Sequence, residues 1–186
     1  MTVLTIASAA PRPSFALPPA LVAMGLALRL ETDADTFFLS RLYASTREVE
    51  IAAMPHWSDA LKHDFLAQQF AAQRHHYRTQ IPDCAYWVIE RAGDPIGRLY
   101  LEERVTQWHV VDIALLPEWR GRGLGTALLE AVIAAARGRA KNVGIFVDRG
   151  NVALHLYRRL GFAEIGETAF HLEMECETGA DADPIS

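Results

Sequence analysis

The hydrophobic and polar positions of this chain follow two periods, one typical of strands and the other of helices. Short apolar or alternating runs predict strands, because successive strand side chains point to opposite faces. Apolar positions three or four residues apart predict helices, because they share one helix face. The strands are expected over residues 26–31, 85–90, 96–103, 108–116, 143–147 and 169–176. The helices are expected over residues 34–44, 60–79 and about 123–137, with one more opening at Asn151.

The order of these elements indicates one α/β domain with a mixed sheet. A turn over residues 92–95 joins two strands directly, whereas helices separate the later strands. The run 108–116 is apolar except at His109 and Asp112, which favours a central strand. Gly138 is expected to end one helix in a left-handed conformation, and Gly161 is expected to cap the next helix.

The two ends of the chain differ in composition from its middle. Residues 1–24 are rich in small apolar residues and prolines, and no Lys or Arg precedes the apolar run, as a secretory signal would require. We expect a flexible N-terminal extension there. Residues 178–186 are polar and acidic, which predicts a disordered tail. The folded domain is therefore expected over residues 25–177.

Length, net charge and the cysteine and histidine positions limit the classes of partner that this chain is expected to bind. The 186 residues suffice for one domain, and no run is long enough to span a membrane, so no membrane partner is expected. The formal net charge of −5 gives no support for a nucleic-acid partner. Cys84 and Cys176 form no C-x-x-C pair, which favours a reduced, cytoplasmic setting and leaves one disulfide open. The histidines show no metal-ligand spacing, so no metal site is predicted.

A glycine-rich segment lies between the strand ending near Leu115 and the helix that follows. It reads Leu-Leu-Pro-Glu-Trp-Arg-Gly-Arg-Gly-Leu-Gly-Thr over residues 115–126. Glycines let the backbone approach a ligand closely. The first N–H groups of the next helix lack partners and carry the positive end of its dipole, which suits phosphate. Arg120 and Arg122 add positive charge, so the segment predicts a pyrophosphate-binding loop.

Two familiar phosphate-binding patterns do not fit this loop. The pattern G-x-G-x-x-G would need a glycine at Thr126, and a P-loop would need a lysine after the glycines. The pattern that fits is R-G-x-G-x-G after a strand and a proline. It resembles the acetyl-CoA loop of the GNAT N-acetyltransferase superfamily. The alternative is a glycine-rich surface turn that happens to precede a helix.

A second motif makes the resemblance specific. Residues 151–162 read Asn-Val-Ala-Leu-His-Leu-Tyr-Arg-Arg-Leu-Gly-Phe and match the GNAT pattern N-x-A-x-x-L-Y-x-x-L-G-F. The two motifs occur in the family's order, with a helix and a strand between them. The resemblance covers about residues 26–176 and is strongest over 110–162. It implies a single GNAT-like domain, with a central mixed, mostly antiparallel sheet of six to seven strands flanked by about four helices.

The resemblance also implies roles for individual residues. The strand ending at Leu115 is expected to pair its backbone with the pantetheine arm, and Asn151 to contact the pantetheine or diphosphate, or to act only as a helix cap. Tyr157 would donate a proton to the departing CoA thiolate, or else be a packing aromatic. A phenol of pKa about 10 is a suitable acid for a thiolate of pKa about 8.5 or higher. The pyrophosphate would be held by backbone amides of Arg120, Gly121, Arg122, Gly123, Leu124, Gly125 and Thr126.

The implied reaction also needs a base, because an amine is mostly protonated at neutral pH. In many relatives a carboxylate or histidine on the strand before the glycine loop has this role. Here His109 lies six residues before Leu115, and its intrinsic pKa suits the task. Simple alternation places it on the face of Ile113 and Leu115, although a bulge would shift it. The alternatives are Asp112, or a structural His109 with water as the base.

Together these inferences predict an enzyme. It would be an N-acetyltransferase that moves an acetyl group from acetyl-CoA to an amine by direct attack in a ternary complex. The acceptor would be a small-molecule or peptide amine, and no metal would take part. The alternatives are a non-catalytic acyl-CoA-binding or regulatory domain, and transfer of a longer acyl group. The sequence leaves the acceptor's identity and a homodimer open.

Overall fold

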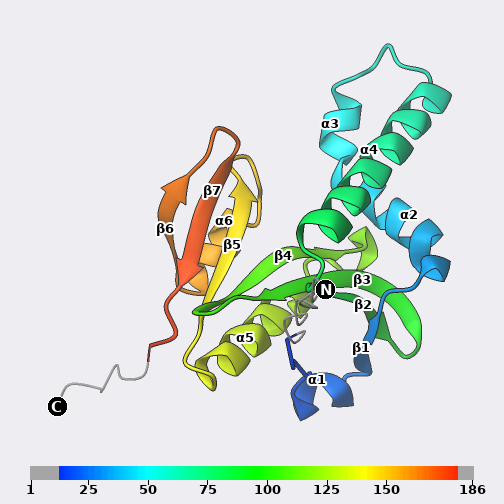
Figure 1. Cartoon of the computed structure of the whole chain (residues 1–186). Coiled ribbons are helices and arrows are strands. Elements are labelled where there is room, and N and C mark those ends of the chain that lie inside the picture. The colour runs from blue at the N-terminus through cyan, green and yellow to red at the C-terminus, as the bar shows by residue number, and fades with distance from the viewer. Residues whose placement is uncertain (1–12, 180–186) are drawn as a thin grey trace, which may run out of the picture.

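Figure 1 shows the computed structural model of the chain, which describes residues 13–179. A seven-stranded sheet with the order β1-β2-β3-β4-β5-β7-β6 forms its centre. The strands are β1 Leu26–Leu30, β2 Ala85–Arg91, β3 Asp94–Glu103, β4 Gln107–Leu115, β5 Asn142–Asp148, β6 Phe162–Glu167 and β7 His171–Cys176. The α-helices of the described residues are α1 Pro19–Ala23, α2 Thr36–Thr46, α3 Glu48–Ala52, α4 Asp59–Gln80, α5 Leu124–Arg137 and α6 Leu154–Arg159. Two 3-10 segments are η1 Asp33–Asp35 and η2 Pro117–Trp119.

The fold class predicted from the sequence is confirmed. The sheet is mixed and mostly antiparallel, as expected, and it has seven strands, the upper end of the expected range of six to seven. The helices exceed the expected four because α1 and α3 are additional, each only five residues long. None of the helices between residues 13 and 179 is both long and apolar enough to cross a membrane.

The sheet opens between its two parallel strands. All neighbouring strands are antiparallel except β4 and β5, which α5 connects. Their pairing covers only Gln107–Val110 against Asn142–Ile145. Beyond Val110, β4 remains paired with β3 and β5 remains paired with β7. Within the described residues, the second half of β4 therefore has no strand on its β5 side.

The helices cover the two faces of the sheet (Figure 1). α5 and α6 lie on one face, where the largest core cluster combines their apolar residues with those of the strands. The stripe of α5 expected from the sequence is buried there: Leu124, Leu128 and Val132 are at most 4% exposed. α2 and α4 lie on the other face and pack through a second cluster that includes Leu39 and Phe70.

A β-bulge in β4 decides which of its side chains face α5. The register of β4 against β3 skips Val111. Val110 before the bulge and Ile113 after it both join the core on the α5 face. An extra residue reverses the alternation of side chains. His109 therefore lies on the opposite face from Ile113 and Leu115, which corrects the placement expected from simple alternation.

Helix α5 ends differently from the expectation. Gly138 has a right-handed backbone with φ −61°, and the left-handed residue is Ala140, with φ 52°. The chain turns at this later position because the N–H of Lys141 donates to the carbonyl of Ala136 at 3.0 Å. Gly161 has φ 91° and follows α6, as expected for a cap.

The sequence pattern did not predict strand β6. Phe162 is its only buried residue, and the register shifts between Glu164 and Gly166, so the alternation of apolar and polar positions is interrupted. The strand forms because β7 supplies backbone partners along its length. A single edge strand with one apolar anchor carries too weak a pattern to be recognised alone.

The described part of the expected N-terminal extension packs on the core. Leu21 of α1 is buried, and the ring of Phe15 lies 5.9 Å from that of Trp87 and 6.1 Å from that of Trp108. Residues 13–24 therefore differ from a flexible extension, because their apolar side chains cover two tryptophans. The rest of the expected extension, residues 1–12, lies outside the described residues.

The first residue of the expected acidic tail also belongs to the domain. Thr178 is 2% exposed, and its hydroxyl donates to the carbonyl of Lys141 at 2.6 Å. Its N–H donates to Oδ1 of Asn142. These bonds fix Thr178 beside β5, whereas residues 180–186 of the expected tail lie outside the described residues.

Candidate active site

The glycine loop connects the open half of β4 to α5. Gly121 and Gly123 have φ of 68° and 78°, in the left-handed region that favours glycine. Gly123 is the N-cap of α5 and offers no side-chain cap, so the first N–H groups of the helix remain available. A Cβ added at Gly121, Gly123 or Gly125 would meet no atom within 4 Å. The loop therefore presents backbone N–H groups beside empty space, which fits a phosphate.

A cavity of about 570 Å³ lies at this loop. Three parts of the chain line it: the end of β4, the loop with the start of α5, and the segment that leads into α6. Eight residues expected in the site belong to its lining, which brings both sequence motifs to one cavity. They are Leu115, Arg120, Gly121, Gly123, Gly125, Thr126, Asn151 and Tyr157.

Three expected site residues do not line this cavity. Leu124 is 4% exposed and its side chain belongs to the core. Arg122 places its guanidinium over the ring of Trp119, 5.1 Å from the centroid. The third is His109, which lies on the face of β4 opposite to Leu115.

Arg120 crosses from the loop to α2. Its Nε donates to the carbonyl of Leu115 at 2.8 Å, and its Nη2 donates to Oγ of Ser45 at 2.7 Å. From the sequence alone, the guanidinium of Arg120 is expected to contact phosphate. In the structure the guanidinium already bonds the protein, so its visible effect is to fasten the loop to α2.

Trp119 is a cavity residue that sequence reasoning missed. It lies in η2 and lines the cavity, and Arg91 stacks on it at 4.9 Å from its centroid, in addition to Arg122. A cation over an indole ring is attracted by its π electrons. The signal in the sequence was a tryptophan directly before two arginines, but the partner Arg91 comes from β2 and could not be seen there.

Asn151 and Tyr157 belong to the α6 segment. Oδ1 of Asn151 accepts a hydrogen bond from the N–H of Ala153 at 2.8 Å, which forms a turn before α6. The helix itself begins at Leu154 with Ala153 as its N-cap, so the expectation that Asn151 opens and caps it is wrong. Tyr157 is 5% exposed, and its ring lies 5.8 Å from that of Phe162. Burial, and secondarily the charge of Asp112, raises the pKa of Tyr157 to about 12. Its hydroxyl therefore stays protonated at neutral pH.

Asp112 sits beside the bulge of β4 and is tied to the face covered by α4. Its carboxylate accepts from Nη2 of Arg98 at 2.7 Å and from the hydroxyl of Tyr77 at 3.3 Å. Arg98 is 3% exposed, so this is a buried ion pair, and its Nε has no partner among the described residues. Sequence reasoning found Asp112 but not Arg98, whose position on β3 becomes informative only through strand pairing.

His109 is buried between β3 and β5. It is 5% exposed, and its ring lies 5.0 Å from that of Phe146. Burial, and secondarily the charge of Arg104, lowers the pKa of His109 from 6.5 to about 4. The imidazole is therefore neutral at pH 7, and it is a weaker base than an exposed histidine.

Metal chemistry has no visible ligand set here. Between residues 13 and 179, no group of three or more His, Cys, Asp or Glu side chains is placed to hold a metal ion. Cys84 is buried, and burial raises the pKa of its thiol to about 12. Tyr157 brings a phenol to the lining of the cavity, and the charge of Asp112 acts on that phenol from outside the lining.

The open sheet and glycine loop occur in a chain that is similar to known acetyltransferases. Residues 82–164 match the family described as "Acetyltransferase (GNAT) domain". An N-alpha-acetyltransferase from Sulfurisphaera tokodaii is 34% identical over 98 residues, which are 45% of this chain and 59% of that protein. The peptidyl-lysine N-acetyltransferase YjaB from Salmonella typhimurium is 27% identical over 108 residues, 57% of this chain and 70% of that protein.

Solved structures share the fold. The PaiA N-acetyltransferase from Thermoplasma acidophilum, in complex with coenzyme A, has a TM-score of 0.61 at 19% identity and covers 83% of this chain and 99% of its own. Ard1 from Thermoplasma volcanium has a TM-score of 0.53 at 16% identity and covers 81% of this chain and 96% of its own. Residues 82–164 of this chain therefore resemble a GNAT acetyltransferase domain, and the fold agrees with that match. It spans 59% of the length of the first relative named above.

His109 should make the fold sensitive to acid. Its pKa is about 4 in the folded chain and 6.5 as a free group, so the unfolded chain takes up the proton first as the pH falls. The neutral buried ring contributes stability above pH 6.5 that is lost on acidification toward pH 4, up to about 3 kcal/mol. Urea unfolding at both ends of this range should show a smaller loss for His109→Gln than for the wild type. The exposed His56→Gln is the control, and equal losses in all three proteins would contradict the assignment.

Proposed function

We propose that this chain is an N-acetyltransferase that transfers an acetyl group from acetyl-CoA to an amine by direct attack in a ternary complex. The observation that carries the proposal is the single cavity that joins the glycine loop to Tyr157 along the open half of β4. The match of residues 82–164 to the GNAT acetyltransferase domain supports the reaction class, and a structural neighbour was solved in complex with coenzyme A.

The cavity offers a place for each part of acetyl-CoA. Backbone N–H groups at Gly123 and in the first turn of α5 would hold the pyrophosphate, with the helix dipole adding to the attraction. The backbone of β4 between Val111 and Ala114, on the side that lacks a strand partner, would bond the pantetheine arm as a further strand would. Arg120 would act on the loop by fixing it to Ser45.

Tyr157 is the proposed donor to the leaving sulfur. Its pKa of about 12 exceeds that of an ordinary thiol of about 8.5, so complete proton transfer to the thiolate is uphill by roughly 5 kcal/mol. Donating a hydrogen bond to the developing charge does not require that full transfer, and such donors act strongly in a buried site. We therefore propose that Tyr157 stabilises the departing thiolate by donating a hydrogen bond and keeps its own proton, and that the thiolate takes a proton from solvent once CoA leaves.

For the base, Asp112 is better supported than His109. Asp112 affects the pKa of Tyr157, so its charge is felt inside the cavity, and its side chain is 14% exposed. Neither Asp112 nor His109 lines that cavity, and of the two only Asp112 affects the pKa of Tyr157. We propose that Asp112 accepts the amine proton through water, held in place by Arg98 and Tyr77.

The proposed class of acceptor rests on the names of two relatives. Two relatives are named for peptide amines, one N-alpha group and one lysine side chain. We therefore propose a small-molecule or peptide amine, and an acceptor panel should contain peptide N-termini, lysine peptides and simple amines. A protein that binds acetyl-CoA but releases no thiol with any of them would favour a non-catalytic acyl-CoA-binding domain.

Gly125→Val should remove acetyl-CoA binding without unfolding the protein. Gly125 lies in the first turn of α5, and an added side chain would enter the open space expected for phosphate. It is a sharper choice than Gly123, where a positive φ adds backbone strain. A ligand at a hundredfold excess over its Kd stabilises a protein by about 2.7 kcal/mol, measurable as a thermal shift. The shift should disappear in Gly125→Val and persist in Gly150→Val, whose added Cβ also meets open space. A normal shift in Gly125→Val would disprove the phosphate assignment.

Tyr157→Phe should lower turnover while acetyl-CoA binding stays intact. The ring keeps its packing against Phe162, and only the hydroxyl donor is lost. Loss of an acid or base typically costs about 10² to 10⁴ in rate. Thiol release with the best acceptor gives kcat, and the thermal shift reports binding. Tyr43→Phe is a matched control, because Tyr43 is also 5% exposed but lies outside the cavity. Unchanged kcat with a chemistry-limited acceptor would exclude Tyr157 as the donor.

Asp112→Asn and His109→Gln should separate the two candidate bases. Asp112→Asn should lower kcat/KM by about 10²-fold or more, whereas His109→Gln should leave most of the rate. If His109 were the base, the acidic limb of the pH profile would lie near its pKa of about 4 and would vanish in His109→Gln. Thermal unfolding of both variants must accompany the kinetics, because Asp112→Asn leaves Arg98 buried without its anion.

A further inference from the structure

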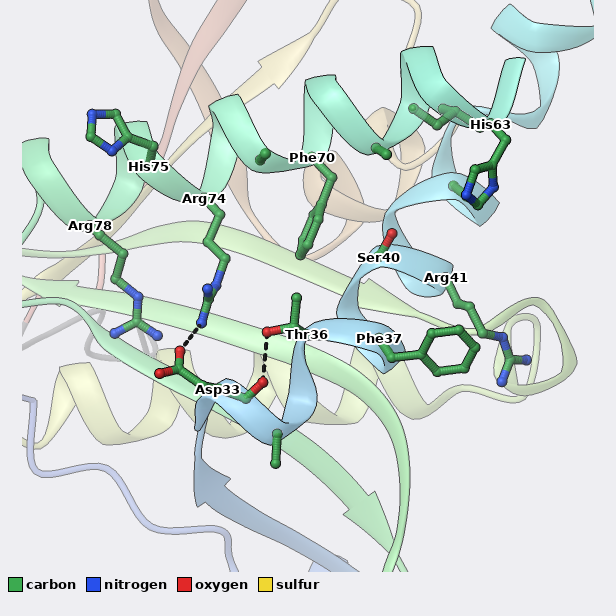
Figure 2. Close-up of a pocket in the computed structure, with 15 residues that line it drawn as sticks. Asp33, Thr36, Phe37, Ser40, Arg41, His63, Phe70, Arg74, His75 and Arg78 are labelled. Carbon is green, nitrogen blue, oxygen red and sulfur yellow. Dashed lines mark hydrogen bonds and ion pairs between the residues drawn. The ribbon is translucent and has the colours of Figure 1, made fainter. Parts of the chain in front are cut away.

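A hollow larger than the cavity at the glycine loop lies between α2 and α4. Its volume is about 1010 Å³, and it shares no lining residue with the cavity that contains Tyr157. Figure 2 shows it as a groove with α4 along one side and α2 along the other. Phe70 extends from α4 into the space between the two helices. We call this hollow the α2–α4 groove.

The walls of the α2–α4 groove suit another helix. On α2 the lining includes Ser40 and Ala44, four residues apart, and on α4 it includes Ala67 and Ala71, also four residues apart. Residues at this spacing share one helix face. Small side chains in such rows leave room for the ridge of a neighbouring helix, which packs at an axial distance of about 8–10 Å.

An exposed aromatic side chain stands next to this groove. Phe37 of α2 belongs to the lining, yet 76% of it is exposed. In Figure 2 it points away from Phe70 and lies alongside Arg41. A protruding apolar side chain beside a hollow on the same face is self-complementary, because a two-fold axis can place each one in the other's hollow.

The charged residues beside Phe37, Asp33 and Arg41, are also arranged so that a two-fold axis could pair them with a second copy. Asp33 and Arg41 both line the groove, and each lies four residues from Phe37, on opposite sides of it. The carboxylate of Asp33 accepts from Arg74 at 2.9 Å through one oxygen, and its side chain is 98% exposed. No hydrogen bond or ion pair within residues 13–179 engages the guanidinium of Arg41. If two α2 helices cross antiparallel at Phe37, Asp33 of each copy faces the partner's Arg41.

We propose that the α2–α4 groove is a homodimer interface, occupied by α2 of a second copy of this chain. The two α2 helices run antiparallel about a two-fold axis near Phe37. Each Phe37 enters the partner's groove toward Phe70, and two Asp33–Arg41 pairs form across the axis. The result is a four-helix packing of α2 and α4 from both copies. The proposal does not depend on the catalytic assignment, because the groove and the active-site cavity have separate linings.

Phe37→Glu tests the apolar part of this interface. Analytical ultracentrifugation of the full chain should show a dimer for the wild type and a dimer dissociation constant at least about 30-fold higher for Phe37→Glu, as for an interface hot spot. Since Phe37 is exposed in one copy, the variant should fold and keep its acetyl-CoA thermal shift. Val105→Glu is the control, because Val105 is 93% exposed in the β3–β4 turn and should leave the dimer intact.

A charge exchange tests the antiparallel arrangement. Arg41→Glu alone and Asp33→Lys alone should each weaken the dimer, because like charges then face each other across the axis. The double variant should recover most of the association, since it restores opposite charges in exchanged positions. A double variant as weak as either single one would overturn the antiparallel pairing.

A monomeric wild type at the highest soluble concentration, or a Phe37→Glu variant that dimerises normally, would overturn the proposed interface. If the wild type is monomeric and a chain lacking residues 1–12 binds an apolar dye that Phe37→Glu rejects, the occupant is that segment of the same chain.

Discussion

The separation of β4 from β5 after Val110 is the constraint on which the site depends. A strand in the middle of a sheet normally has partners for its backbone groups on both sides, and leaving them unpaired in a buried place is costly. Here one side of β4 has no strand partner between the bulge at Val111 and Ala114, and it lies next to a cavity instead, while the carbonyl of Leu115 accepts from Arg120. The glycine loop follows immediately, so the free strand edge and the free N–H groups of α5 face the same space. A ligand with a polar arm and a phosphate satisfies both.

The opposite face of β4 holds that strand in position through buried charge. Arg98 and Asp112 form their ion pair under α4, joined by Tyr77. Such a pair is worth little as net stability, but losing one partner leaves an uncompensated buried charge. The geometry at the bulge is thereby fixed, and the same carboxylate acts on Tyr157 from the far side of the strand. Arg120 completes the frame, because it ties the loop to Ser45 on α2.

The cavity at the glycine loop and the α2–α4 groove have different chemistry. The cavity at the glycine loop combines backbone donors, a phenol and the end of a strand, which suits a reactive small molecule. The groove between α2 and α4 has rows of small side chains with an exposed Phe37 at its edge, which suits a helix. α2 takes part in both regions, since Ser45 anchors the loop while Phe37 lies on the other part of the same helix. Assembly and catalysis would thus meet in one short helix.

The sequence by itself determined the local features of this protein. Gly121 and Gly123 permit a left-handed backbone, Asn151 forms a turn before α6, and the apolar spacing of α5 indicates its buried face, because each feature depends on residues close in sequence. Residues of both motifs line one cavity, although Arg122, Leu124 and His109 do not. Tertiary structure alone decided the environment of His109, since a single bulge reversed its face and burial lowered its pKa. It also decided that Arg120 bonds Ser45, that Arg98 holds Asp112, and that β6 forms at all. These outcomes depend on pairing between distant segments, and no local pattern of apolar and polar residues records which strand edge or side chain will lie opposite.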